Sequence, residues 1–198
     1  MSTLLKPLSI REELLKKRIF IFTPRDFERA FQLPKPKAKY FLEKESVGGL
    51  FVRLKKGLYG LKTDLPHEEE IANRLYQPSY LSFEYALGHY NILPEMTYSV
   101  TSATTKSTRT FVVAGKTFSY LTIKKEAYTG YLLLKKDNQV FLMAEAEKAL
   151  VDYLYFVILG KKPINDRLNL ASLKKEKVRQ YARLYQKASL SRLIEKLK

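Results

Sequence analysis

The sequence predicts an α+β protein with two domains, and three observations indicate this class. Residues 24–61 have the spacing of two short helices and a hairpin, whereas residues 98–142 hold runs rich in aromatic and β-branched residues. Residues 144–159 form a helical segment that is apolar almost all round, and two amphipathic helices follow it. We therefore expect a helical N-terminal domain, and a second domain in which a mostly antiparallel, curved sheet of about four or five strands packs on a buried core helix.

Length and composition limit the classes of protein that the chain can represent. Its 198 residues, 45% of them hydrophobic, are enough for one medium domain or two small ones. No apolar run approaches the roughly 18 to 20 residues of a membrane span, and the first ten residues lack the centre of a signal peptide, so we expect a cytoplasmic protein with no membrane partner. The chain has no cysteine and two histidines, which excludes disulfides and thiolate metal sites. No metal, cofactor or catalytic residue is expected.

The formal net charge of +16 is concentrated at the two ends of the chain. Residues 1–65 carry 15 basic and 7 acidic side chains, residues 66–133 carry 6 of each, and residues 134–198 again carry 15 and 7. This distribution favours a polyanionic partner, and nucleic acid is the commonest one.

The first domain is expected to begin with a helix at residues 9–18 and a short strand at 19–22, followed by two helices. Thr23 and Pro24 are typical of a helix start, because a hydroxyl caps the backbone and proline suits the first turn. Residues 33–36 (LPKP) separate the two helices, and Gly48 with Gly49 ends the second. Apolar residues at i, i+3 and i+4 give each helix one buried stripe: Phe27, Ala30 and Phe31, then Ala38, Phe41 and Leu42.

A β-hairpin is predicted directly after the second helix, with strands at 50–54 and 58–61 and a turn at 55–57. Helix, tight turn, helix and basic hairpin is the plan of a winged helix-turn-helix, which places its second helix in the major groove of DNA. Polar residues and a proline at 63–66 mark the boundary. The expected domains are therefore residues 1–65 and 66–198.

One face of the second helix carries the predicted contacts to double-stranded DNA. Tyr40 lies at the centre of the side opposite the apolar stripe, and basic residues flank it. The hairpin adds cations that are placed for phosphates of the adjacent backbone. The alternative is that these charges are only the solvated side of a small helical unit. The predicted DNA-binding residues are Lys35, Lys37, Lys39, Tyr40, Glu43, Lys44, Arg53, Lys55 and Lys56.

The second domain is expected to start with helices at residues 67–75 and 80–90, the latter capped by the hydroxyl of Ser79. Its predicted strands lie at 98–101, 110–113, 117–123, 130–134 and 139–142. In the core helix at 144–159, Lys148 and Asp152 form a narrow polar strip. Two C-terminal helices follow, with apolar sides made by Leu173, Val178, Tyr181 and Tyr185, and by Leu190, Leu193, Ile194 and Leu197.

Four segments of the second domain resemble the AbiEi family of antitoxins from type IV toxin–antitoxin systems. They are residues 77–87 (QPSYLSFEYAL), 92–95 (ILPE), 101–102 (TS) and 144–152 (AEAEKALVD), and their spacing matches as well. Ala146 departs from the pattern, because the family commonly has proline there. The resemblance, which covers nearly the whole chain, implies a repressor that binds inverted repeats in its own promoter. It also implies an antitoxin that antagonises a nucleotidyltransferase-like toxin without a stable complex.

The residues by themselves leave other interpretations open. Glu145 and Glu147 complement the dipole at the start of the core helix, so we interpret the matched segment 144–152 as structural and not as a catalytic site. A metal-dependent nuclease would use Asp137 with Glu145 or Glu147 beside Lys148, although this spacing lacks a carboxylate two residues before the lysine. The third interpretation is a binding module for RNA or protein. It would use a secondary basic surface of Lys174, Lys175, Lys177, Arg179, Arg183 and Lys187.

Overall fold

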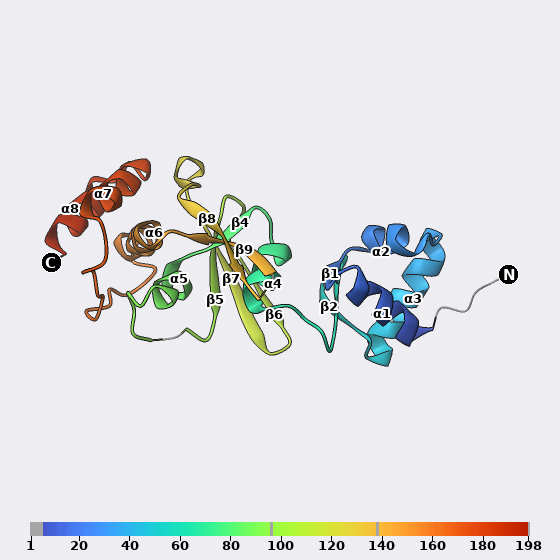
Figure 1. Cartoon of the computed structure of the whole chain (residues 1–198). Coiled ribbons are helices and arrows are strands. Elements are labelled where there is room, and N and C mark those ends of the chain that lie inside the picture. The colour runs from blue at the N-terminus through green and yellow to red at the C-terminus, as the bar shows by residue number, and fades with distance from the viewer. Residues whose placement is uncertain (1–5, 96, 138, 198) are drawn as a thin grey trace. The chain divides into compact units, whose positions relative to one another are not determined.

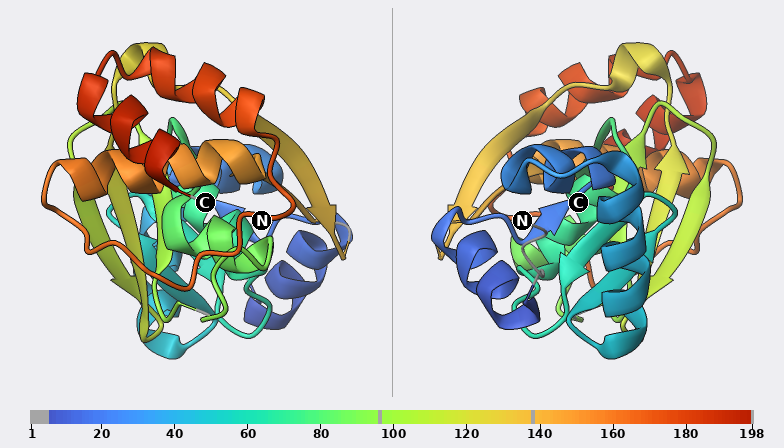
Figure 2. Two further views of the ribbon diagram at one scale, coloured as in Figure 1. Left: turned by 90° about the vertical axis from the view of Figure 1, so that its left-hand side faces the viewer. Right: turned by 90° about the vertical axis from the view of Figure 1, so that its right-hand side faces the viewer.

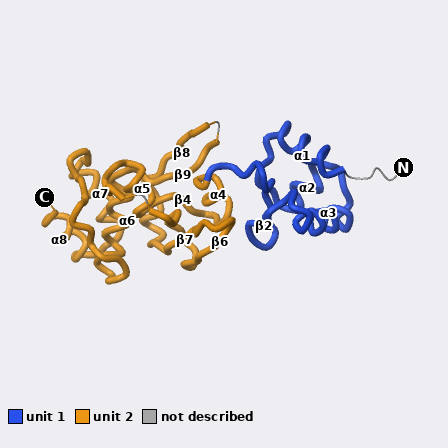
Figure 3. Tube along the Cα trace, turned by 90° about the horizontal axis from the view of Figure 1, so that it is seen from below, with its two compact units in different colours: residues 1–67 blue, residues 68–198 orange. Residues whose placement is uncertain are grey.

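A computed structural model describes residues 6–95, 97–137 and 139–197 and confirms the α+β class (Figure 1). The chain divides into two compact units, residues 1–67 and residues 68–198 (Figure 3). We call them the N-terminal and the C-terminal unit. Within the described residues, no helix has the length and apolar character needed to cross a bilayer.

In its described residues, 6–67, the N-terminal unit contains three helices and a three-stranded antiparallel sheet of order β1-β3-β2. Its elements are α1 (Pro7–Lys16), β1 (Ile21–Phe22), α2 (Pro24–Phe31), α3 (Lys35–Gly48), β2 (Phe51–Lys55) and β3 (Leu58–Leu61). The predicted cap of α2 is confirmed, since the Asp26 N–H donates to Thr23 Oγ1 at 3.2 Å and Asp26 Oδ2 accepts from the Thr23 N–H at 3.0 Å. Gly49, with φ of +89°, ends α3 in the left-handed conformation that glycine favours.

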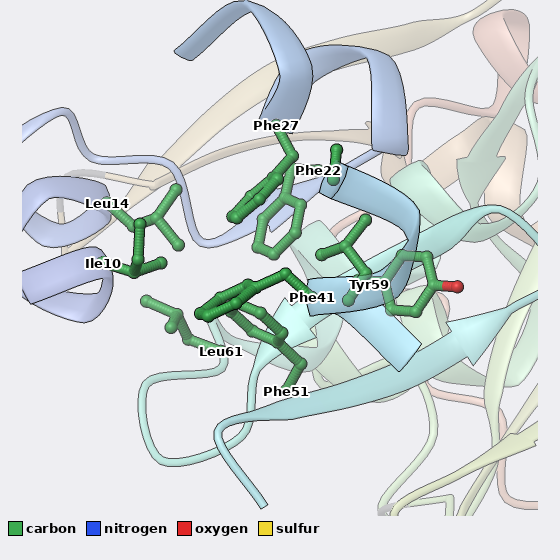
Figure 4. Packing of buried hydrophobic residues seen from close by; sticks show 10 residues of the cluster. Ile10, Leu14, Phe22, Phe27, Phe41, Phe51, Tyr59 and Leu61 are labelled. Atoms are coloured by element: carbon green, nitrogen blue, oxygen red, sulfur yellow. The ribbon is translucent and has the colours of Figure 1, made fainter. Parts of the chain in front are cut away.

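Phenylalanine rings form the core of the N-terminal unit (Figure 4). Phe27 of α2 stacks on Phe41 of α3 with ring centroids 5.8 Å apart, and Phe51 of β2 meets Phe22 edge-on at 5.3 Å. Ile10 and Leu14 of α1 close the cluster. This packing determines which sides of α2 and α3 are buried, and therefore which side of α3 faces solvent.

The C-terminal unit is built on a six-stranded sheet of order β6-β7-β5-β4-β9-β8. Three neighbouring pairs are antiparallel, while β5 with β7 and β4 with β9 are parallel. The strands are β4 (Ser79–Leu81), β5 (Val100–Thr104), β6 (Arg109–Val113), β7 (Lys116–Thr122), β8 (Tyr131–Lys136) and β9 (Gln139–Ala144). The sheet thus has one strand more than the sequence predicted, and that strand is β4.

Helices cover both faces of this sheet, with α4 on one face and α5 and α6 on the other (Figure 1). The two C-terminal helices lie against α6, as both views of Figure 2 show. The bounds are α4 (Glu68–Leu75), α5 (Phe83–His89), the short η1 (Lys125–Ala127), α6 (Ala146–Ile158), α7 (Lys175–Leu184) and α8 (Ala188–Lys196). The predicted core helix is confirmed, because α6 is buried along nearly its whole length.

The predicted helix start at Ser79 and Tyr80 is wrong. Ser79, Tyr80 and Leu81 form β4, a central strand that is buried on both faces between β5 and β9. Helix α5 begins later, at Phe83, and its Tyr85 N–H donates to Thr101 Oγ1 at 3.2 Å. A short run without polar alternation does not distinguish a strand from a helix, so pairing with distant strands decided the conformation.

Candidate nucleic-acid interface

The solvent-facing side of α3 is the candidate interface of the N-terminal unit. Because Ala38, Phe41 and Leu42 are buried in the core, the opposite side of the helix projects into solvent. Tyr40 is 68% exposed on this side and does not belong to the hydrophobic core cluster of the unit. Lys35, Lys39, Glu43 and Lys44 are exposed around it, and Lys37 is half-buried.

The lysines of this face keep their charge available. Lys35, Lys37 and Lys44 have no carboxylate partner within the described residues. The Nζ of Lys39 lies 4.0 Å from Glu43 Oε1 in a solvent-exposed pair, and such pairs contribute little stability. A charged partner can therefore replace this contact at low cost.

Val47 belongs to the same face, although the sequence analysis did not include it. It is 92% exposed and lies seven residues after Tyr40, so both side chains fall on one line along the helix. The spacing of seven was the signal that could have identified it. An exposed aliphatic group beside an exposed tyrosine suits contact with thymine methyl groups in a major groove.

The hairpin of β2 and β3 presents the other predicted cations. Arg53 and Lys56 are exposed, whereas Lys55 is half-buried. The register of the two strands shifts between Arg53 and Lys55, and Gly57 turns the chain with φ of +75°. The tip therefore offers Arg53 and Lys56 as its most accessible charges.

An ion pair fixes α1 to the segment that follows the hairpin. The Arg11 Nε and Nη2 atoms donate to the two carboxylate oxygens of Asp64 at 2.8 and 2.7 Å. The hydrogen bond from Arg11 lowers the pKa of Asp64 below its usual value, and the Thr63 hydroxyl adds to this effect. For Asp26, burial by itself raises the pKa, but hydrogen bonds from Thr23 and Arg29 outweigh it and leave the pKa lowered.

The structure divides the secondary basic surface into two kinds of cation. Lys177 Nζ lies 2.7 Å from Glu145 Oε2, and Arg179 makes two bonds of 2.8 and 2.9 Å to Glu195. These two charges are compensated. Of the other cations of this surface, Lys174, Arg183 and Lys187 are exposed without a carboxylate partner within the described residues, whereas the exposed Lys175 interacts electrostatically with Glu195.

The structure does not pair Lys148 with Glu145 or Glu147, as the nuclease interpretation requires. Lys148 is fully buried, and its ammonium bonds to Asp152. Glu145 instead accepts from the Tyr181 hydroxyl and pairs with Lys177, while Glu147 Oε1 accepts the Lys174 N–H at 3.3 Å. In the described part of the chain, no group of three or more histidine, aspartate or glutamate side chains is placed to hold a metal.

A pocket of about 470 Å³ lies between α6, α7, α8 and the segment before α7. Leucine is the commonest residue of its lining. The charged side chains there are Lys175, Arg179 and Glu195, of which the last two bond to each other. It therefore presents few polar groups to orient a cofactor.

A buried polar network lies at the centre of the C-terminal unit and joins two of the segments that carry the AbiEi resemblance. Asp152 Oδ2 accepts from Tyr80 at 3.0 Å and from Ser82 at 2.7 Å, while Oδ1 accepts from Lys148 and, at 2.5 Å, from Tyr185. Burial lowers the pKa of Lys148, whereas the neighbouring Asp152 carboxylate raises it. Burial also raises the pKa of both tyrosines well above the usual value. Its hydrogen bonds join β4, through Tyr80, and the C-terminal end of α7, through Tyr185, to Asp152 of α6.

Comparison with known proteins gives no family assignment, since no protein-family model and no curated protein sequence matches the chain.

Proposed function

We propose that the protein is a sequence-specific, DNA-binding transcriptional repressor whose N-terminal unit is a winged helix-turn-helix. One observation carries this proposal: α3 exposes Tyr40 at 68% among lysines, of which only Lys39 has a carboxylate neighbour within the described residues, Glu43 at 4.0 Å. An exposed aromatic ring on a basic helix, with a basic hairpin directly after it, suits a major groove and its flanking phosphates.

Protection of the protein's own upstream DNA tests the proposal. Full-length protein is footprinted on that DNA and titrated against a random duplex of equal length. We expect a protected inverted repeat and an affinity for it that exceeds the random duplex by at least about a thousandfold at physiological salt. Equal affinity for both duplexes would contradict sequence-specific repression.

We further propose that the protein regulates its own toxin–antitoxin operon and antagonises a nucleotidyltransferase-like toxin without forming a stable complex. This part is supported by the AbiEi-like segments, of which residues 77–87 and 144–152 meet in the buried network of the C-terminal unit. Co-expression with the nucleotidyltransferase of the same operon tests it. We expect growth to be restored by the full chain, with no co-purification of the two proteins.

A further inference from the structure

The longest stretch of the chain that has cations but no acidic residue lies in the sheet of the C-terminal unit. Residues 96–125 contain five basic and no acidic side chains. Lys116 bonds to Glu68 of α4 at 2.6 Å and is compensated. Lys106, in the turn between β5 and β6, and Arg109, the first residue of β6, are in contrast exposed and have no carboxylate partner within the described residues. Their charges remain available to an anionic ligand.

Aromatic rings, rather than acids, hold these two cations in place. Lys106 Nζ lies 5.6 Å from the ring centroid of Tyr76, and the Arg109 guanidinium lies 5.8 Å from the same ring and 5.9 Å from that of Phe111. A cation–π contact orients a charged group without cancelling its charge. The guanidinium therefore keeps its planar set of donors for a phosphate group.

The backbone around Lys106 is fixed before any ligand binds. Its N–H donates to Thr104 Oγ1 at 3.2 Å, and its carbonyl accepts from the Thr122 hydroxyl at 2.7 Å. The Tyr76 hydroxyl donates to the next carbonyl, that of Ser107, at 3.1 Å. Because the turn is already ordered, binding carries little additional entropic cost there.

The rings of this site are available to a ligand that carries flat groups. Tyr76 and Phe111 are partly exposed, and both pack on the buried Tyr120, with ring centroids 5.2 and 5.8 Å from it. Phe111 belongs to β6, which is an edge strand of the sheet, and Tyr76, which follows α4, packs beside it with ring centroids 5.9 Å apart. Single-stranded nucleic acid presents phosphates together with unstacked bases, whereas a duplex hides the base faces.

We propose that Tyr76, Lys106, Arg109 and Phe111 form a binding site for single-stranded nucleic acid at the β6 edge of the C-terminal unit. Lys106 and Arg109 contact successive phosphates, and bases pack on the two rings. The site includes none of the residues proposed to bind duplex DNA, so the two proposals stand or fall separately.

Fluorescence anisotropy of labelled oligo(U) and oligo(dT) of about 12 nucleotides with the full-length protein tests this site. The double variant Lys106→Ala/Arg109→Ala should bind at least one of these oligomers more weakly and lower its log–log salt slope by about 1.4, at roughly 0.7 per phosphate. The matched control, Lys135→Ala/Arg192→Ala, removes two exposed charges of the same unit that belong to no proposed binding surface, and should change neither quantity. A loss confined to the control variant would overturn the assignment, as would failure of the native protein to bind either oligomer.

The contribution of the rings is tested with Phe111→Leu, which keeps an apolar side chain in the strand. We expect affinity for the base-containing oligomer to fall about tenfold, and affinity for an abasic oligomer of equal length to stay unchanged. Equal binding of both oligomers by the native protein would show a general polyanion surface and refute the proposal. Lys106→Ala/Arg109→Ala should retain operator binding, so the outcome is distinguishable from failure of the proposed repressor function.

Discussion

Tyr185, which directly follows α7, donates a hydrogen bond of 2.5 Å to Asp152 Oδ1 of α6, so the C-terminal helices are attached to the core helix through a fully buried carboxylate. The same carboxylate accepts from Tyr80 and Ser82 and pairs with Lys148. Asp152 thus has three hydroxyl donors besides its cation, whereas Lys148 pairs with no other carboxylate in the described part of the chain. This asymmetry predicts unequal effects of removing either partner.

Asp152→Asn should destabilise the protein more than Lys148→Met. The first change leaves a buried ammonium without a counter-ion and should cost about 3–5 kcal/mol in the free energy of unfolding. The second leaves a carboxylate that three hydroxyls still solvate. Urea unfolding of both variants measures the difference, with Lys177→Ala as a surface control expected to cost less than about 1 kcal/mol. Equal costs for the two core variants would contradict the prediction.

Tyr40→Ala should leave folding nearly intact and weaken binding to the operator. Because the side chain is 68% exposed, we expect the free energy of unfolding to change by no more than about 0.5 kcal/mol. Its neighbour Phe41 is buried, and Phe41→Ala should cost about 3–5 kcal/mol. Melting curves and operator titrations of both variants test this pair. A large fall in the stability of Tyr40→Ala would place the ring in the core instead of the groove.

Arg53→Ala/Lys56→Ala should weaken binding to all duplex sequences alike, since the hairpin tip is proposed to contact phosphates. Losing two such contacts should lower the log–log salt slope by about 1.8, at roughly 0.9 per phosphate. Titrations of operator and random DNA at several salt concentrations measure it. An unchanged salt slope would show that the hairpin does not contact the DNA phosphates.

Acid should weaken the N-terminal unit through Asp64. Its pKa is lower in the folded protein because Arg11 donates to the carboxylate. A lowered folded-state pKa contributes stability above the unfolded value of about 3.9, and this contribution disappears as the pH falls through the folded-state value. Asp64→Asn should therefore be less stable than the native protein at neutral pH, and the difference should shrink below about pH 4. Urea midpoints at both pH values check this, and a difference that does not depend on pH would contradict it.

The spacing of residues within each helix was enough to predict the helix ends of the N-terminal unit and the exposed side of α3. Thr23 caps α2 and Gly49 ends α3, because capping and left-handed backbone depend on neighbours within one helical turn. The exposure of Tyr40 follows from the buried stripe of the same helix, since a period of 3.6 residues fixes which side faces outward. The strands predicted after residue 98 were also confirmed, with small shifts at their ends.

Only the tertiary structure decided features whose partners are remote in the sequence. The segment Ser79–Leu81 became a strand because β5 and β9 supply its hydrogen bonds. Asp152 is stabilised in the core by hydroxyls about 70 residues away, at Tyr80 and Ser82. Likewise, the charge of Arg179 is paired with Glu195, whereas Arg109 makes cation–π contacts with two rings. Counting charged residues along the sequence does not reveal this difference. Spacing fixes the direction of a side chain, but burial and charge compensation depend on which distant groups the fold brings beside it.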